Sequence, residues 1–204
     1  PGSLAQINVV LSVFFAGISG SATADAASQS KIFIDAQVKE GYDLSFSIAI
    51  TAVSAVLAVI IPPSILMIVW GGLISTSIAA MYLAGIVPGL LIAGAQMVTV
   101  HMYATRRGYP TYAKSTWGEM YKATLLAIPA MVTPFLIVGG ILLGWFTATE
   151  SAAVAVIYSI ILSGFYYREI GPKQLYRALL DTGKLSGIAL FCIGTASAFG
   201  WMLA

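Results

Sequence analysis

The segment Gly17-Ile18-Ser19-Gly20-Ser21-Ala22-Thr23-Ala24-Asp25 places small, hydroxylated and acidic residues directly after an almost entirely apolar run that begins at Val9. Non-helical backbone at membrane depth is tolerated only where protein buries it or where it lines a water-filled cavity. An acidic side chain such as Asp25 at that depth indicates a functional site. A second interruption, Ile61-Pro62-Pro63-Ser64, lies inside a later apolar stretch. Two broken segments in one membrane protein favour a transport site.

Composition places the chain among integral membrane proteins. Of its 204 residues, 59% are hydrophobic and 9% are charged, whereas roughly a quarter of the residues in soluble domains are charged. The net charge of +2 is too small to indicate a nucleic-acid partner. The single cysteine, Cys192, excludes an intramolecular disulfide, and we expect it to pack within an apolar helix. No signal peptide precedes the first apolar run, and Ala204 lies inside the last one, so we expect an internal piece of a longer chain.

Several apolar stretches are long enough to cross a membrane, because a crossing needs about 20 residues. They are residues 82–104, 123–147, 149–167 and 186–204. Two shorter stretches, 5–20 and 24–38, flank the Gly/Ser segment and predict a re-entrant hairpin. Residues 44–80 are too long for one straight crossing and are interrupted by two prolines, which predicts a single broken helix.

The sequence therefore predicts an all-α, polytopic membrane protein. The expected parts are a re-entrant hairpin over 1–40, a broken transmembrane helix over 41–80, a transmembrane helix over 81–104, a cytoplasmic interfacial segment over 105–122, two transmembrane helices over 123–167, a cytoplasmic amphipathic arm over 168–185, and a truncated transmembrane helix over 186–204.

Basic residues gather in two of the polar connections, and by the positive-inside rule both connections are cytoplasmic. They are Arg106, Arg107, Lys114 and Lys122 in the first connection and Arg168, Lys173, Arg177 and Lys184 in the second. Two spans lie between these connections and return the chain to the same side. Counting backwards, residues 44–80 must cross the membrane once, and the hairpin must enter and leave on the cytoplasmic side.

Both polar connections carry signs of helices that lie on the membrane surface. Thr116 and Glu119 have the spacing of a capping box, and Pro172 suits the first position of a helix. After Pro172, leucines and basic residues occupy opposite faces, which is typical of an interfacial helix; ordinary cytoplasmic loops are the alternative. Pro129 and Pro134 are expected to kink the span that contains them.

The hairpin tip offers two kinds of partial charge. Its first half-helix ends in unpaired carbonyls, which attract a cation, and its second begins with unpaired amides, which attract a carboxylate. Ser19, Ser21 and Thr23 add hydroxyl oxygens. At the second interruption, Pro62 and Pro63 have no N–H, so the carbonyls four residues earlier lose their helical donors.

Hydroxyls and carbonyls without thiols or a histidine cluster suit Na⁺ better than a transition metal. The predicted sodium ligands are Ser19, Gly20, Ser21, Ala58, Ile61 and Pro63. The residues expected beside the substrate are Ser19, Ser21, Thr23, Asp25 and Ser64. Two plainer interpretations remain open: the small residues only permit tight helix packing and the prolines only make a kink, and Asp25 only favours the dipole of its own helix.

Several motifs together resemble the large membrane subunit of tripartite ATP-independent periplasmic (TRAP) transporters. They are Phe15-Ala16-Gly17-Ile18-Ser19-Gly20-Ser21-Ala22-Thr23-Ala24-Asp25-Ala26-Ala27, Gly41-Tyr42, Ile61-Pro62-Pro63-Ser64, Gly139-Gly140-Ile141, and Gly144 with Phe146-Thr147-Ala148-Thr149-Glu150-Ser151-Ala152-Ala153. The resemblance extends along the whole chain.

The resemblance implies a secondary transporter of the elevator type within the ion-transporter superfamily, rather than an enzyme, with two inverted repeats that each carry a hairpin and a broken helix. It further implies Na⁺ coupling, a small membrane subunit, and a periplasmic binding protein that delivers an organic anion such as a C4-dicarboxylate or sialic acid. The implied location is the bacterial inner membrane. The second hairpin of that family is absent from this chain, so a second cation site cannot be assigned.

Two other functions compete with this interpretation. Gly17-Ile18-Ser19-Gly20 has the Gly-x-Ser-Gly form of a rhomboid-like nucleophile, and His101 is the sole histidine; a Ser/His dyad needs the two groups within hydrogen-bond reach. An anion/Na⁺ symporter of the same superfamily outside the tripartite family is the other alternative. Glu150 is expected to cap a helix or face water at an outer turn, with a helix-contact role as the alternative.

Overall fold

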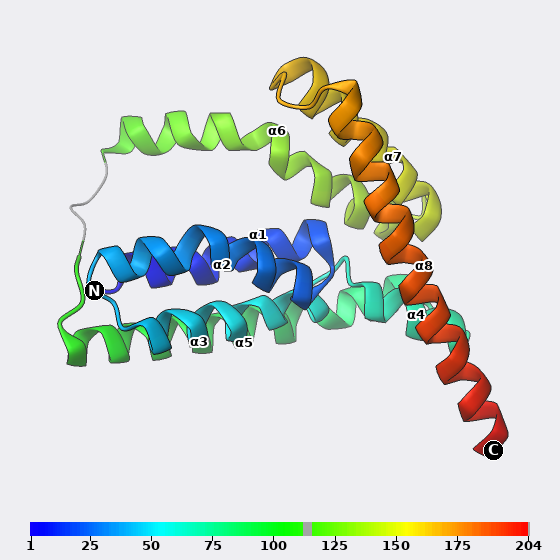
Figure 1. Cartoon of the computed structure of the whole chain (residues 1–204), viewed down its shortest axis with the longest axis horizontal. Helices are drawn as coiled ribbons and strands as arrows, with labels where there is room; N and C mark the ends of the chain where they lie inside the picture. Colours follow the sequence, from blue (N-terminus) through cyan, green and yellow to red (C-terminus); the bar gives the residue numbers. More distant parts are fainter. Residues whose placement is uncertain (112–115, 204) are drawn as a thin grey trace. The chain divides into compact units, whose positions relative to one another are not determined.

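The computed structural model describes residues 1–111 and 116–203, and every regular element within these ranges is helical (Figure 1). Lys114, which entered the topology prediction, lies outside the described residues. The chain divides into two compact units, residues 1–158 and residues 159–204. Each unit is described by itself.

The first two helices of unit 1 form a hairpin. Helix α1 (Ser3–Ser19) and helix α2 (Ala22–Lys39) are joined at Gly20 and Ser21. Gly20 has a φ of +60°, a left-handed conformation that favours glycine. The Ser21 hydroxyl accepts a hydrogen bond from the backbone amide of Ala24, 3.4 Å away, and so caps α2. Both half-helices are therefore defined by residues of the Gly/Ser segment.

The next helix is interrupted where the prolines predict a break. Helix α3 (Leu44–Ala55) tightens into the 3₁₀ turn η1 (Val56–Val59), residues 60–64 are not helical, and α4 (Ile65–Leu73) resumes. Helix α4 ends well before residue 80, where the predicted segment ended. The reason lies in the following polar residues, because the Ser77 hydroxyl accepts from the amide of Ala80 and starts a new helix.

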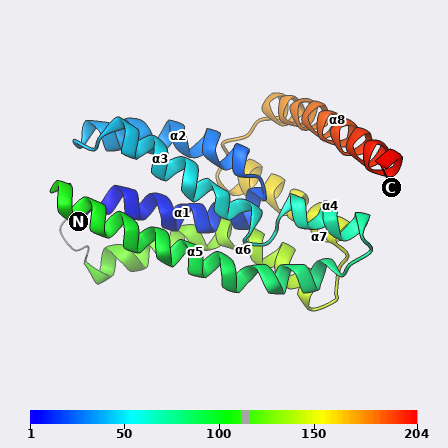
Figure 2. The ribbon, with the colours of Figure 1, turned by 90° about the horizontal axis from the view of Figure 1, so that it is seen from below.

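Four helices of unit 1 lie alongside one another (Figure 2). Helix α1 contacts α2, α3 and α5 (Ile78–Arg107), and α2 contacts α3. An apolar cluster holds α1, α3 and α5 together; its fully buried members include Ala5, Val9, Leu57, Val100 and Ala104. Residues such as Ala5 and Ala104 are small, which lets these helices approach closely.

A line of buried polar residues, here called the polar seam, joins the hairpin to α3. It consists of Asn8, Ser12, Gln29, Ser47, Thr51 and Ser54. The Asn8 amide donates to the Thr51 hydroxyl over 2.8 Å, and the Ser12 hydroxyl donates to the Gln29 amide oxygen over 2.7 Å. Because hydrogen bonds are strong where water is excluded, the seam fixes the register of the hairpin against α3.

Helices α6 (Trp117–Leu142) and α7 (Ala148–Ile161) follow α5. The predicted capping box is confirmed at the start of α6, where the Glu119 carboxylate accepts from the amide of Thr116 over 3.0 Å. Helix α6 contains Pro129 and Pro134 and bends along its length (Figure 1). It runs without a break across the predicted boundary at residue 122, so the capped segment and the span belong to one helix.

The expected capping role of Glu150 is also seen. Its carboxylate accepts hydrogen bonds from the Thr147 amide and the Thr147 hydroxyl, each 2.8 Å long, at the start of α7. The same hydroxyl lies 3.3 Å from the Glu150 amide, which donates to it. This reciprocal pair satisfies donors that a helix start otherwise leaves unpaired.

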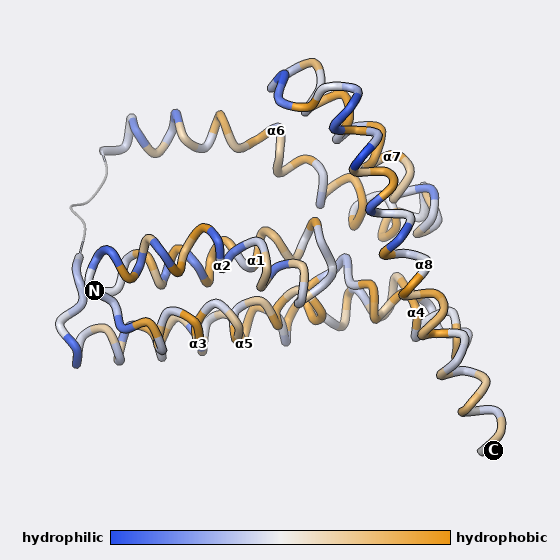
Figure 3. Tube along the Cα trace, in the orientation of Figure 1, coloured by the Kyte–Doolittle hydropathy of each residue, from blue (hydrophilic) through white to orange (hydrophobic). Residues whose placement is uncertain are grey.

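Unit 2 begins at the end of α7 with the π-helical turn η2 (Leu162–Tyr166) and continues as α8 (Pro172–Leu203). Hydrophilic and hydrophobic residues alternate along the first half of α8, and the second half is mostly hydrophobic (Figure 3). The helix is continuous through residue 185, where the predicted arm ended. Cys192 is exposed on α8, contrary to the expectation that it packs, because no described residue of unit 2 covers that face.

Four helical segments are long and apolar enough to cross a membrane. They are Ile78–Arg107, Trp117–Leu142, Ala148–Tyr166 and Pro172–Phe199. Their apolar side chains are largely exposed, as at Leu91 (69%) and Phe135 (71%). A contiguous exposed apolar surface of this extent is stable in lipid or against other protein, not in water. The chain is thus a multi-pass membrane protein.

Candidate functional site

The hydroxyls of the hairpin tip are connected to one another and to Asp25. The Ser19 hydroxyl donates a short hydrogen bond to the Asp25 carboxylate and accepts from the amide of Ser21 over 3.3 Å. The hydroxyls of Ser21 and Thr23 lie 3.1 Å apart. The structure therefore brings together all four hydroxyl and carboxylate groups predicted at the tip.

Asp25 is the most constrained of these groups. It sits in the first turn of α2 and is 1% exposed. One carboxylate oxygen accepts from Ser19, and the other is buried with no hydrogen-bond partner within the part of the chain that the structure describes. A buried anion with an unused oxygen is unfavourable unless a positive charge or a donor meets it. This burial favours a role for Asp25 beside a cation, and the alternative that it only favours the dipole of its helix stays untested.

The hairpin tip contacts the break in the following helix. The backbone amide of Ile65, the first residue of α4, donates to the carbonyl of Gly20 over 3.2 Å. A Cβ atom on Gly20 would lie 2.8 Å from the carbonyl oxygen of Pro63, so only glycine fits at this point. Residues 20 and 63, both predicted as sodium ligands, are therefore neighbours in space.

The two prolines release one carbonyl and not the other. In a helix, the carbonyl of Ala58 would accept a hydrogen bond from the backbone amide of residue 61 or 62. The Ile61 amide donates instead to the carbonyl of Leu57 over 2.8 Å, and Pro62 has no N–H to donate. The carbonyl of Ala58 thus receives neither. The carbonyl of Val59, which we also expected to be free, accepts from the Ser64 hydroxyl over 2.9 Å.

This contact changes the interpretation of Ser64. Its hydroxyl proton is used inside the break, and its oxygen accepts from the Met67 amide over 3.5 Å as the cap of α4. Ser64 is fully buried. It therefore holds the two ends of the break together, and a substrate contact through this hydroxyl stays a prediction.

The donor set at the tip and the break fits a hard monovalent cation. It contains hydroxyls from Ser19 and Ser21, the released carbonyl of Ala58, and a buried carboxylate oxygen on Asp25 without a partner. Ile61 and Pro62 line a small pocket with Gly17 beside the tip, while the Ile61 side chain packs toward α5. In the described ranges, no group of three or more His, Cys, Asp or Glu residues has the arrangement of a metal site. Oxygen donors of this kind suit Na⁺ rather than a transition metal.

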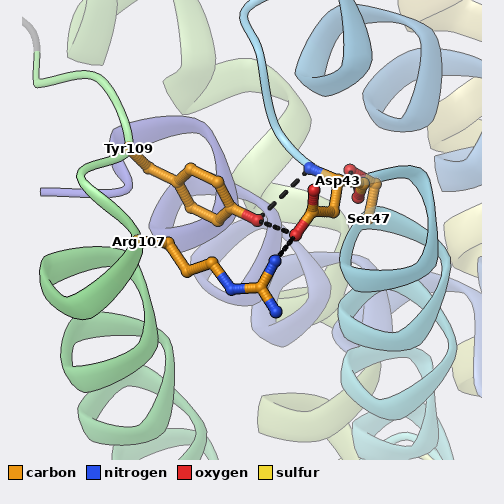
Figure 4. Close-up of polar contacts among 4 residues, drawn as sticks. All are labelled: Asp43, Ser47, Arg107 and Tyr109. Atoms are coloured by element: carbon orange, nitrogen blue, oxygen red, sulfur yellow. Dashed lines mark hydrogen bonds and ion pairs between the residues drawn. The ribbon is translucent and has the colours of Figure 1, made fainter.

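A polar cluster that sequence reasoning missed lies at the opposite end of the hairpin (Figure 4). The Arg107 guanidinium forms an ion pair with Asp43, and the Tyr109 hydroxyl donates to the same carboxylate over 2.9 Å. The Asp43 amide donates back to the Tyr109 oxygen over 3.2 Å. Burial raises the pKa of the Tyr109 phenol above its ordinary value, which already keeps the phenol protonated at neutral pH. More than sixty residues separate Asp43 from Arg107 and Tyr109, so no local sequence pattern indicates this pairing.

This cluster holds the end of α5, which is capped by the left-handed Gly108, against the start of α3. It joins the turn between α2 and α3 to the end of α5, and the amide of Gly2 at the start of α1 donates to the carbonyl of Pro110 over 3.2 Å. The open end of the hairpin and Arg107 therefore lie at the same end of unit 1. The predicted topology requires this arrangement, and the side of the membrane that this end faces stays a prediction.

The two groups of the suggested protease dyad lie far apart. His101 shares a surface pocket with Ser3 and Gln6 at the start of α1, whereas Ser19 is the last residue of that helix. Sixteen residues of α-helix separate Ser3 from Ser19, a length of roughly 24 Å at 1.5 Å per residue. Hydrogen-bond contact between Ser19 and His101 is excluded in this arrangement, and so is the dyad.

Comparison with known families decides the class of protein. The family model described as "Tripartite ATP-independent periplasmic transporter, DctM component" matches residues 1–204. The chain belongs to this family. The resemblance drawn from the sequence motifs is thereby confirmed, and the Ser19–Asp25 tip and the Gly20–Ile65 contact lie within a TRAP large permease.

Individual relatives in the family carry names of different substrates. The sialic acid TRAP transporter permease protein SiaT of Haemophilus influenzae is 38% identical over 203 residues, which cover 100% of this chain and 33% of the relative. The sialic acid TRAP transporter large permease protein SiaM of Vibrio cholerae is 34% identical, with 100% and 48% covered. The ectoine TRAP transporter large permease protein TeaC of Halomonas elongata is 34% identical, with 99% and 47% covered.

The chain thus spans between a third and a half of the length of these relatives. All three are named as transporter permeases, not as enzymes, in agreement with the expectation that the chain has no enzymatic activity.

Proposed function

We propose that this TRAP permease chain takes part in Na⁺-coupled import of a small organic anion across the bacterial inner membrane. The observation that carries the proposal is the contact between the hairpin tip and the broken helix, where the Pro63 carbonyl meets Gly20 between the linked side chains of Ser19, Ser21 and Asp25. Broken helices whose ends meet near the membrane midplane are the usual place for ions and substrates in secondary transporters.

The proposed cation ligands are the Ser19 and Ser21 hydroxyls and backbone carbonyls of Gly20, Ala58, Ile61 and Pro63. Asp25 supplies the negative charge. In the described ranges it forms no ion pair, so one bound Na⁺ would compensate its charge at a short distance. Because Ser19 donates its only hydroxyl proton to Asp25 and accepts from the Ser21 amide, one lone pair of Ser19 remains available to a cation.

The proposed substrate position lies on the other side of the tip, at the start of α2. Thr23 is exposed there and Ser21 is partly exposed, and amides at a helix start carry partial positive charge that attracts a carboxylate. Relatives are named for sialic acid and for C4-dicarboxylate. A carboxylated metabolite is therefore the proposed substrate class.

The proposed mechanism is an elevator movement with two partner proteins. The hairpin and the broken helix move as one body, because the Gly20–Ile65 bond and the polar seam tie them together. A periplasmic substrate-binding protein delivers the anion, and a small membrane subunit supports the static part. Family membership supports this proposal of two partners.

Uptake into liposomes that contain the complete transporter tests this function. The substrates offered are sialic acid, a C4-dicarboxylate and ectoine, each with the cognate binding protein, under an inward gradient of Na⁺ or of K⁺ at equal ionic strength. We expect uptake of one carboxylate with Na⁺ only. Equal uptake with either cation would refute Na⁺ coupling.

Single alanine variants then test the ligands. Ser19→Ala or Ser21→Ala should raise the Na⁺ concentration for half-maximal uptake about 5- to 150-fold, the range that corresponds to losing about 1–3 kcal/mol from a buried polar partner. Ser28→Ala is the matched control, since Ser28 is exposed on α2 and bonds only its own helix. An unchanged Na⁺ dependence in both tip variants would remove Ser19 and Ser21 from the site.

A further inference from the structure

Helix α5 lies directly against the break through one narrow face, here called the α5 contact face, which consists of Tyr82, Gly85 and Gly89. All three residues are buried, and their spacing places them on one side of the helix. Neither glycine has a positive φ, so backbone conformation does not explain them. Their role must come from what they touch.

The two glycines meet different parts of the break. A Cβ atom on Gly85 would lie 2.4 Å from the carbonyl oxygen of Ile60, which is backbone. A Cβ atom on Gly89 would lie 2.4 Å from Cγ1 of Ile61, which is side chain. A side chain can shift by rotation, whereas a backbone carbonyl moves only with its peptide plane. Gly85 is therefore the position where α5 controls the path of the chain.

A shift of the Ile60 carbonyl would also change the hydrogen bonding near the released carbonyl of Ala58. The Ile60 carbonyl and the Ile61 amide belong to the same rigid peptide unit, and that amide donates to Leu57 over 2.8 Å. A shift of this unit would disturb the bond from the Ile61 amide to Leu57, and the same amide is the donor that Ala58 would accept in a 3₁₀ turn. Ala58 is fully buried, and whether its carbonyl stays without an amide partner depends on the space that Gly85 leaves.

Tyr82 contacts the far side of the break. It is 0% exposed, and its hydroxyl lies beside the backbone of Ser64. Within the part of the chain that the structure describes, no group meets the geometry of a hydrogen bond with that hydroxyl. Ser64 in turn ties Val59 to α4. A buried tyrosine at this place supports the residue that spans the break.

We propose that Gly85 and Tyr82 are positioning residues of the cation site: α5 holds the break in the geometry that directs backbone carbonyls toward the hairpin tip. The proposal rests on the proposed Na⁺ site, and it assigns to a membrane-spanning helix a role that no motif indicates.

The test is Na⁺-dependent thermal stabilisation of the purified complete permease without substrate, with K⁺ as the control salt. A ligand that binds only the folded state raises its stability in proportion to occupancy. Gly85→Ala should raise the Na⁺ concentration for half-maximal stabilisation by about tenfold or more. Gly89→Ala should have a smaller effect. Gly94→Ala, on the same helix with no heavy atom within 4 Å of its added Cβ, should stay within about twofold of the parent.

Tyr82→Phe keeps the result decisive if Gly85→Ala does not fold. It retains the ring and removes only the hydroxyl that lies beside the Ser64 backbone, the one polar contact that the described residues show between Tyr82 and the break. If that contact positions Ser64, the same Na⁺ midpoint should rise several-fold while the melting temperature in K⁺ stays near that of the parent. A parent protein that Na⁺ does not stabilise would contradict the proposed Na⁺ site itself. A parent that responds, with Tyr82→Phe and any folded Gly85→Ala variant responding identically, would overturn the role of α5.

Discussion

The backbone amide of Ile65 donates a 3.2 Å hydrogen bond to the carbonyl of Gly20, so the first residue of α4 caps the tip of the preceding hairpin. This bond uses an amide that the start of a helix leaves unpaired and a carbonyl that the end of a helix leaves unpaired. It links two interruptions that are more than forty residues apart in sequence. The geometry of the proposed cation site depends on it.

Replacing Gly20 tests this link. Gly20→Ala adds a Cβ at a positive φ and 2.8 Å from the Pro63 carbonyl, so both strain and collision oppose it. Gly41→Ala is the matched control, because Gly41 has a φ of +89° and no heavy atom within 4 Å of an added Cβ. We expect Gly41→Ala to lower stability by about 1 kcal/mol with uptake retained, and Gly20→Ala to abolish Na⁺-driven uptake. Equal effects of the two variants would show that the contact with Pro63 is unimportant.

The charge of Asp25 can be removed with little change in shape. Asp25→Asn keeps an oxygen that accepts from Ser19 but cannot compensate a cation. The Na⁺ concentration for half-maximal uptake should rise at least about tenfold, with protein yield unchanged. Asp35→Asn, an exposed position on the same helix, should leave it unaltered. A parent-like Na⁺ dependence in Asp25→Asn would return Asp25 to a purely structural role.

The two prolines of the break should be needed because they withhold amides. In Pro62→Ala/Pro63→Ala, new amides can bond the carbonyls of Ala58 and Val59 and extend η1 toward α4. Since a proline inside a helix is about 3 kcal/mol less favourable than alanine, the double variant should melt at a higher temperature than the parent. Its melting temperature should respond less to Na⁺, and its uptake should be lost. Retention of uptake together with the Na⁺ response would show that the break is only a kink.

Cysteine labelling tests the predicted topology. In a Cys192→Ala background, Gln174→Cys and Tyr112→Cys should react only from the cytoplasmic side, and Thr147→Cys only from the periplasmic side. The reason is that two spans separate the basic connections. Tyr112 lies outside the described residues, and Thr147 directly precedes α7. Reaction of residues 112 and 174 from opposite sides would overturn the prediction.

Local sequence was enough to predict both interruptions. Glycine and hydroxyl residues at 17–23 and the proline pair at 62–63 act on their own backbone, and the capping box at Thr116 is equally local. For the same reason the release of the Ala58 carbonyl could be predicted from the missing amide of Pro62. The tip residues themselves required no knowledge of distant contacts.

What escaped prediction depends on distant contacts. The Ser64 hydroxyl reaches Val59 only because the chain turns between them, and Asp43 meets Arg107 and Tyr109 only when α5 returns along α3. Gly85 lies in a glycine-containing apolar helix with no motif around it. Such pairings arise from packing, which residue spacing alone does not report.

Equilibrium binding of radioactive Na⁺ to the purified complete permease is the most direct test of the cation site at the hairpin tip. The titration compares the parent with Ser19→Ala, and Ser28→Ala serves as the control. We predict that Ser19→Ala binds one fewer Na⁺ per permease at concentrations that saturate the parent and Ser28→Ala. Binding by Ser19→Ala with the stoichiometry and affinity of the parent would contradict the account.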